Sequence, residues 1–291
     1  MSFFRASGGN KFKIVNGSAK VRVATSKILY FNGAVNNDWS TLGNWWLDES
    51  CTISATHLPR SIDSVTISAQ ITANNGSAPT VANIIISDVT LDIAITVIGV
   101  AIFSSGGIGD FGELTGSAIF NGYSGSVGII YGSATFNDFS SNHGTVSGDA
   151  TFNDDAYNNN TVSGNATFND SSVNYGGTVN GDANFNDSSY NDATVTSNAT
   201  FNDSSYNSGT VNGDANFNDS SYNYGTVTSN ATFNDSSVNY GGTVNGDATF
   251  NNSSVNYGGT VTGTATFTGS SCNIGGGTAG TFVPNPPPSC S

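Results

Sequence analysis

Apolar side chains recur at fixed offsets from a repeating phenylalanine between Phe103 and Phe267. Successive phenylalanines are sixteen or seventeen positions apart, at Phe103, Phe120, Phe136, Phe152, Phe168, Phe185, Phe201, Phe217, Phe233, Phe250 and Phe267. With phenylalanine as position 0, valine stands at −6 and alanine at −2, so these residues share one face of a strand because side chains alternate between its two sides. A period of this size predicts a solenoid of stacked coils, in which neighbouring coils supply the core that one coil lacks.

The rest of each period predicts two turns and a second, shorter strand. Asn-Asp follows the phenylalanine and favours a turn with left-handed backbone. Ser-Ser-Tyr/Val-Asn comes next as the second strand, with Tyr222 or Val238 as its apolar residue. We expect phenylalanine to stack on phenylalanine and turn asparagines to form ladders. The predicted fold is all-β: a single-stranded β-solenoid (parallel β-helix) of 16–17-residue coils with an N-terminal cap region.

A two-coil super-repeat is superposed on the period. At position −3, Asp182, Asp214 and Asp247 alternate with asparagine in the intervening coils, at Asn165, Asn198 and Asn230. This alternation halves the crowding of like charges that a continuous aspartate column would have.

Composition divides the chain into four segments. They are a basic arm at 1–27, a Trp-containing β cap and first coils at 28–102, Asn/Gly-rich coils at 103–283, and a Pro-rich tail at 284–291. Strict alternation from Val89 to Val97 predicts one apolar strand, and the stretch 106–116 is interpreted as a Gly-rich turn region. Proline cannot extend a hydrogen-bonded ladder, so the tail should blunt the open edge.

Charge is distributed very unevenly along the chain. The formal net charge is −14, yet every Lys and Arg lies at or before Arg60, and six of the seven precede any acidic residue: Arg5, Lys11, Lys13, Lys20, Arg22 and Lys27. We expect this arm either to attach the protein to an acidic surface or to be a solvated terminus. The acidic remainder should repel nucleic acid and anionic membranes. The most apolar run, from Ile93 to Phe103, is too short to span a membrane, and the start of the chain lacks the apolar core of a secretory signal.

Few residues are candidates for catalysis or for binding a metal or cofactor. There are only two Glu, Glu49 and Glu113, while the Asp residues mostly keep repeat register, so we expect no catalysis. The histidines, His57 and His143, are isolated, and we expect no cofactor. The turn column after phenylalanine could instead bind Ca²⁺ through five aspartates, the alternative being turn formation in water: Asp170, Asp187, Asp203, Asp219 and Asp235.

Two further sets of side chains leave alternatives open. Tyr224, Tyr240 and Tyr257 repeat on three successive coils and would either contact a host-surface glycan or stack on one another. Cys272 and Cys290 would either form a disulfide that folds the tail onto the last coil or remain thiols.

The segment before the coils carries a motif. It contains Trp39, the pair Trp45-Trp46 after an asparagine, Pro59, and a strand beginning at Asp63 that reads Asp-Ser-Val-Thr-Ile. This stretch resembles the opening segment of bacterial and phage surface β-helix proteins. The resemblance implies a cap and nucleus for the solenoid and no activity. Trp45 and Trp46 would cap the first coil or, alternatively, form a sugar-stacking platform.

These features together predict a non-enzymatic structural virion protein: a phage fibre, spike or capsid-decorating protein whose acidic rod is anchored by its N-terminus. We expect a homo-oligomer, with a trimer as one arrangement, in contact with other virion proteins through the N-terminal region. A bacterial surface or matrix fibre and a carbohydrate-binding adhesin are the alternatives.

Overall fold

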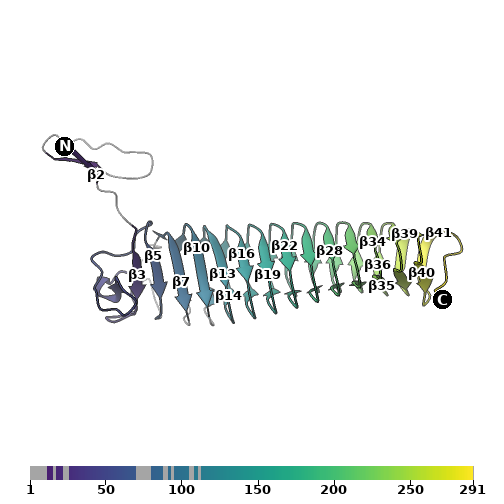
Figure 1. The fold of residues 1–291 in the computed structure, drawn as a ribbon, viewed down its shortest axis with the longest axis horizontal. Helices are drawn as coiled ribbons and strands as arrows, with labels where there is room; N and C mark the ends of the chain where they lie inside the picture. Colours follow the sequence, from purple (N-terminus) through teal and green to yellow (C-terminus); the bar gives the residue numbers. More distant parts are fainter. Residues whose placement is uncertain are drawn as a thin grey trace.

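The coils stack into one elongated rod, with the Trp-containing region at one end and the C-terminus at the other (Figure 1). This computed structural model describes residues 26–69, 80–87, 95–104 and 113–290, and the backbone of residues 12–15, 18–21, 91–92 and 108–110. The described residues are almost entirely strands and turns, with one 3₁₀ turn, η1 (Leu42–Asn44). The predicted fold class is confirmed: the chain is a parallel β-solenoid whose equivalent strands recur at the period of the phenylalanines.

Each coil contains three short strands. In one coil these are β30 (Thr210–Val211), β31 (Ala215–Phe217) and β32 (Tyr222–Asn223), and each pairs in parallel with its equivalents in the coils before and after. The expectation of two strands per coil is therefore wrong. The chain bends at positions −5 to −3, where the Gly213 backbone passes so close to Ser197 that a Cβ would lie 2.5 Å from its carbonyl carbon. The bend splits the expected long strand into two.

The strands of the coils fall into three rows. The first row is β6 (Thr80–Val81), β9 (Thr96–Val97), β12 (Glu113–Leu114), β15 (Ile129–Ile130), β18 (Thr145–Val146), β21 (Thr161–Val162), β24 (Thr178–Val179), β27 (Thr194–Val195), β30, β33 (Thr226–Val227) and β36 (Thr243–Val244). The second row is β3 (Ile28–Phe31), β5 (Ser64–Ile67), β7 (Asn83–Ser87), β10 (Val100–Ser104), β13 (Ser117–Phe120), β16 (Ala134–Phe136), β19 (Ala150–Phe152), β22 (Ala166–Phe168), β25 (Ala183–Phe185), β28 (Ala199–Phe201), β31, β34 (Ala231–Phe233) and β37 (Ala248–Phe250). In the last coils the two rows merge in β39 (Thr260–Phe267), which pairs with β41 (Thr278–Val283).

The third row forms a sheet of its own. Its members are β8 (Leu91–Asp92), β11 (Ile108–Asp110), β14 (Gly125–Ser126), β17 (Ser141–Asn142), β20 (Tyr157–Asn158), β23 (Val173–Asn174), β26 (Tyr190–Asn191), β29 (Tyr206–Asn207), β32, β35 (Val238–Tyr240), β38 (Val255–Tyr257) and β40 (Cys272–Ile274). Because β8 lies here and β9 lies in the first row, the single strand expected at 89–97 is wrong. The turn region expected at 106–116 also already holds β11 and β12 in coil register. Val89 and Ile93 lie outside the described residues.

One continuous column of rings fills the core. Consecutive phenylalanines from Phe103 to Phe267 have centroids 4.7–4.8 Å apart and planes within 9° of parallel, as the period predicted. Strand register extends the column toward the N-terminus through Ile86, Ile67 and Phe31. At this spacing the phenylalanine part of the rod is about 48 Å long.

Two ladders of asparagine amides run beside the rings. The outer ladder occupies position +1, and each Nδ2 donates to the Oδ1 of the preceding coil at 2.8–2.9 Å, from Asn251 back to Asn121. The inner ladder occupies position +6, is buried from Asn142 to Asn256, and donates in the opposite direction, from Asn142 toward Asn273. Asparagine amides can be buried here because each pairs with the coils on both sides.

The inner ladder corrects the expectation for the second strand. Tyr222 and Val238, at +5, are half-buried, whereas Asn223 and Ser221 point inward and are fully buried. A phenol placed inside would need a polar partner, while an amide column supplies its own. The inward face of this strand is therefore polar.

Additional segments pack at both ends of the rod. At the N-terminal end, β3 pairs with β5 and with β4 (Trp45–Trp46), and the fully buried Trp45 ring contacts Phe31 and Trp39 at 5.0 and 4.7 Å. At the C-terminal end, the tail returns alongside β40, where the Asn273 N–H donates to the Pro288 carbonyl at 2.8 Å. A disulfide joins Cys272 and Cys290, whose Cα atoms are 5.1 Å apart. No helix among the described residues is long and apolar enough to cross a membrane.

Candidate functional site

The basic arm is described only in part. Arg5, Lys11 and Arg22 lie outside the described residues. Lys13 in β1 (Phe12–Val15) and Lys20 in β2 (Ser18–Val21) are register partners in an antiparallel pair. This pairing sets two cationic positions directly opposite each other. Lys27 is exposed at the point where the arm joins the first coil.

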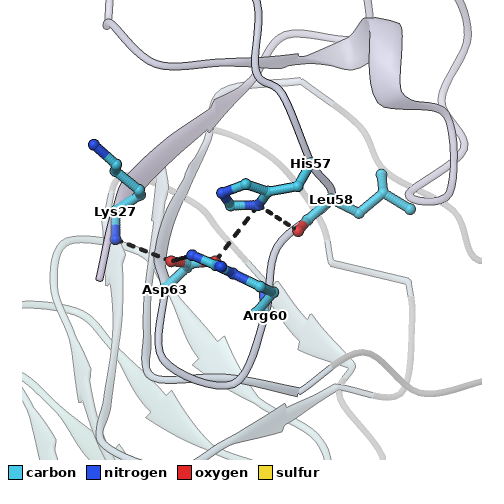
Figure 2. Close-up of polar contacts among 5 residues, drawn as sticks. All are labelled: Lys27, His57, Leu58, Arg60 and Asp63. Carbon is cyan, nitrogen blue, oxygen red and sulfur yellow. Dashed lines mark hydrogen bonds and ion pairs between the residues drawn. The ribbon is translucent and has the colours of Figure 1, made fainter. Parts of the chain in front are cut away.

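The fully buried carboxylate of Asp63 forms this junction (Figure 2). It accepts hydrogen bonds from the Lys27 N–H at 2.9 Å and from the Arg60 N–H, Nε and Nη2 at 2.8–3.0 Å. Burial alone would raise the pKa of Asp63, but the Arg60 hydrogen bonds and charge, together with the Lys27 N–H, lower it below its usual value. Asp63 therefore fastens the base of the arm to the strand that opens the solenoid.

His57 lies against the same group. Its Nδ1 is 2.9 Å from the Leu58 carbonyl oxygen and 3.8 Å from the nearer Asp63 oxygen (Figure 2). The short contact to a carbonyl identifies Nδ1 as the protonated nitrogen, because a carbonyl can only accept. Sequence reasoning missed this contact, since both residues lie outside the repeat and carry no register that would relate them.

The aspartates of the turn column, which include the five candidates for Ca²⁺, all have the same left-handed backbone conformation. Asp138, Asp154, Asp170, Asp187, Asp203, Asp219 and Asp235 all have φ between 56° and 59°, and Gly122, Asn252 and Gly269 share the position and its positive φ. Only Gly, Asn and Asp enter this region readily, which accounts for these three residue types. Among the described residues no group of three or more His, Cys, Asp or Glu side chains could hold a metal ion.

The alternating column at −3 acts as a ladder between side chain and backbone. Asp214 Oδ1 accepts the Asn230 N–H at 3.0 Å, and the Asn230 Oδ1 accepts the Asp247 N–H at 3.0 Å. The Ser229 hydroxyl also donates to Asp214, and these bonds lower the pKa of that carboxyl; Ser197 and the Asn198 N–H do the same for the pKa of Asp182. Either residue type can accept the bond, so alternation keeps the ladder while it halves the charge.

Tyr224, Tyr240 and Tyr257 form an exposed column on the outer face of the third-row sheet. Their side chains are 47, 47 and 43 % exposed, and the last two rings stack at 4.8 Å. Burial and the neighbouring phenols Tyr222 and Tyr240 raise the pKa of Tyr224. The rings cover part of one another and leave their outer edges free.

A groove on the same face was missed at the level of sequence. It has a volume of about 420 Å³ and is lined by Tyr157, Val173 and Tyr190, which are register partners on three successive coils, and by His143, Asp155, Asn159 and Tyr175. The sequence does contain a sign of this groove, because valine stands between tyrosines in the +5 column. That pattern predicts a groove only once the +5 side chains are known to face outward.

Other candidates are separated in space or buried. Glu49 lies in the cap, whereas Glu113 lies in β12, where its charge raises the pKa of Tyr131. Trp45 is fully buried and cannot stack on a sugar, and Trp46 uses its Nε1–H to bond Asn32 Oδ1 at 2.9 Å.

The fold and these surfaces define a parallel β-solenoid with a capped core and an aromatic outer face. No protein family, curated protein or solved structure matches the chain.

Proposed function

We propose that the protein is a non-enzymatic structural rod on the surface of a virion, as a phage fibre, spike or capsid-decorating protein anchored by its N-terminal arm. The observation that carries the proposal is the continuity of the ring and amide columns. From Ala134 to Phe267 each coil repeats the contacts of the one before it. Uninterrupted columns of this kind suit a protein that holds the components at its two ends at a fixed separation.

The contacts between coils support stiffness. Each interface within the regular part combines a stacked phenylalanine pair, two amide hydrogen bonds and parallel strand pairing along three rows. Bending the rod would stretch these contacts together on its convex side. A capped rod of this kind keeps the groups at its two ends apart.

The charge distribution supports a direction of attachment. Every Lys and Arg lies at or before Arg60, and the Asp and Glu residues beyond that point leave the rest of the chain acidic. A cationic end would be attracted to an acidic surface while the acidic rod is repelled by it, so the rod would stand away from the surface. The same arm is our proposed contact for self-association into a homo-oligomer.

Immunogold electron microscopy with an antibody against the rod tests the assignment to a virion. We expect label on purified phage particles, whereas label on bacterial cells alone would contradict it and favour the surface-fibre alternative. A variant with Lys11→Glu, Lys13→Glu and Lys20→Glu should be lost from particles. Its matched control carries Asp170→Asn, Asp187→Asn and Asp203→Asn, which the solenoid should accept because Asn252 already stands at that turn position, and it should be retained.

A carbohydrate-binding adhesin is the second candidate, favoured by the exposed column of Tyr224, Tyr240 and Tyr257. Binding on a glycan array that disappears when all three are replaced by alanine would support it. Array binding that survives the triple replacement would remove this column from consideration.

A further inference from the structure

We propose that the groove between Tyr157 and Tyr190 binds one pyranose ring of a neutral glycan. This goes beyond the structural rod and uses residues outside the Tyr224–Tyr257 column. The outward +5 column reads Tyr157, Val173, Tyr190 on three coils in register, so the smaller valine stands between two tyrosines. The missing ring leaves a slot.

The spacing of the coils fixes the width of the slot. Tyr190 and Tyr206 are adjacent in this column, and their ring centroids lie 4.6 Å apart with planes 4° from parallel. Two coil spacings separate the strands that carry Tyr157 and Tyr190, which is roughly 9.5 Å. The slot therefore has room for one ring where a third tyrosine would stand, with Val173 as its apolar floor.

The walls offer aromatic surface to that ring. One face of Tyr190 is covered by Tyr206 in the next coil, so its opposite face lies toward Val173. At the other wall, Tyr157 is held by an edge contact to His143, with centroids 5.8 Å apart and planes at 85°. Aromatic faces suit the C–H faces of a sugar, and they are fixed by neighbours before any ligand arrives.

Polar groups surround the slot and suit hydroxyls at the edge of the ring. The exposed Asp155 carboxylate is an acceptor, and Tyr175, 60 % exposed, carries a phenol at the rim. The Asn159 amide donates to His143 Nδ1 at 3.2 Å, which leaves Nε2 as the protonated donor of the imidazole. A flat apolar ligand would leave these groups without partners, and an acidic sugar would meet both Asp155 and the net charge of −14.

The Tyr224–Tyr257 column lacks this arrangement. Tyr240 and Tyr257 stack directly at 4.8 Å, so nothing as thick as a ring fits between them. The slot arises because valine, rather than tyrosine, stands at +5 between Tyr157 and Tyr190.

The test compares two valine-to-tyrosine variants of the full-length protein. Val173→Tyr fills the slot with the residue that neighbouring coils already carry, so the solenoid should accept it. Val238→Tyr makes the same change outside the groove, beside Tyr222 alone. Binding would be measured by saturation-transfer NMR and by titration. The neutral probes are chitotetraose, maltotetraose and cellotetraose, and the acidic probe is oligogalacturonate. A third probe, p-nitrophenol, is a flat aromatic ring that lacks the several hydroxyl groups of a sugar.

We expect at least one neutral oligosaccharide to bind, and Val173→Tyr to weaken it at least about tenfold while Val238→Tyr leaves it unchanged. Asp155→Ala, at an exposed position, should weaken binding about fivefold without any effect on folding. The proposal is overturned if no neutral probe binds at about 10 mM, if Val173→Tyr binds as the wild type does, or if oligogalacturonate or p-nitrophenol binds more tightly than the neutral sugars.

Discussion

The inner asparagine ladder should contribute far more to stability than the buried serines beside it. Asn207 sits in the middle of this ladder, fully buried, where its Oδ1 accepts from Asn191 at 2.8 Å and its Nδ2 donates to Asn223 at 2.9 Å. Replacement by alanine removes both bonds at once, together with a longer Nδ2 bond to the Gly209 carbonyl at 3.3 Å. The Asn191 amide keeps a bond to the Ala193 carbonyl at 3.1 Å, but Asn223 Oδ1 loses its amide donor.

The size of the effect follows from these contacts. The bond from the Asn191 amide, which keeps another acceptor, is worth about 1 kcal/mol net, and leaving the buried Asn223 Oδ1 without its donor costs about 1–3 kcal/mol, so Asn207→Ala should lower the free energy of unfolding by about 2–4 kcal/mol. Ser205, in the same coil, is the matched control. Within the described part of the chain its buried hydroxyl has no hydrogen-bond partner, and Ala156 already occupies the equivalent position. Ser205→Ala should therefore change stability by less than about 0.5 kcal/mol.

Urea unfolding followed by far-UV circular dichroism measures the difference, while tryptophan fluorescence reports separately on the cap. The reasoning is refuted if Asn207→Ala and Ser205→Ala lower the midpoint equally. It is also refuted if Asn273→Ala costs as much as Asn207→Ala, because Asn273 is only half-buried and its replacement breaks one amide pair and one bond to the Gly277 carbonyl.

Three further predictions concern other contacts. Asp63→Asn should lower stability by about 1–2 kcal/mol, reduced because Arg60 is partly exposed, and tryptophan fluorescence should show the loss in the cap first. Phe201→Leu removes two stacked pairs and should cost about 2 kcal/mol in the same urea assay. Because the folded pKa values of Asp182 and Asp214 are lowered, these groups stabilise above their unfolded pKa and lose that contribution as pH falls below about 4. The stability advantage of wild type over Asp182→Asn/Asp214→Asn should therefore shrink in acid, and an advantage that stays constant with pH would contradict this.

Spacing along the chain predicted what depends on one coil meeting an identical coil. The period of phenylalanine was sufficient for the stacked rings, and turn chemistry was sufficient for the left-handed aspartates such as Asp219. From its polarity alone, asparagine is expected on a solvent-exposed face. The burial of Asn223 follows only from the pairing of its amide with the asparagine amides of neighbouring coils along the rod axis. The repeat does contain a sign of this burial, because +6 is asparagine in every coil from Asn142 to Asn273 while +5 is tyrosine in some coils and valine in others. To predict the groove over Val173, one would also have to know which face of the third-row strands is exposed to solvent.

The two amide ladders also end in bonds to other groups of the same chain. At the donor ends, Asn273 Nδ2 bonds the Gly277 carbonyl at 2.9 Å, and Asn121 Nδ2 bonds the Phe103 carbonyl at 3.4 Å. At the acceptor ends, Asn142 Oδ1 receives the Gly144 N–H and Asn251 Oδ1 receives the Thr268 hydroxyl. Stacked asparagine ladders are also what allows amyloid to recruit further chains without limit. Here every terminal amide bonds within the same polypeptide, so the molecule has an amyloid-like interior whose amide ladders are closed at both ends.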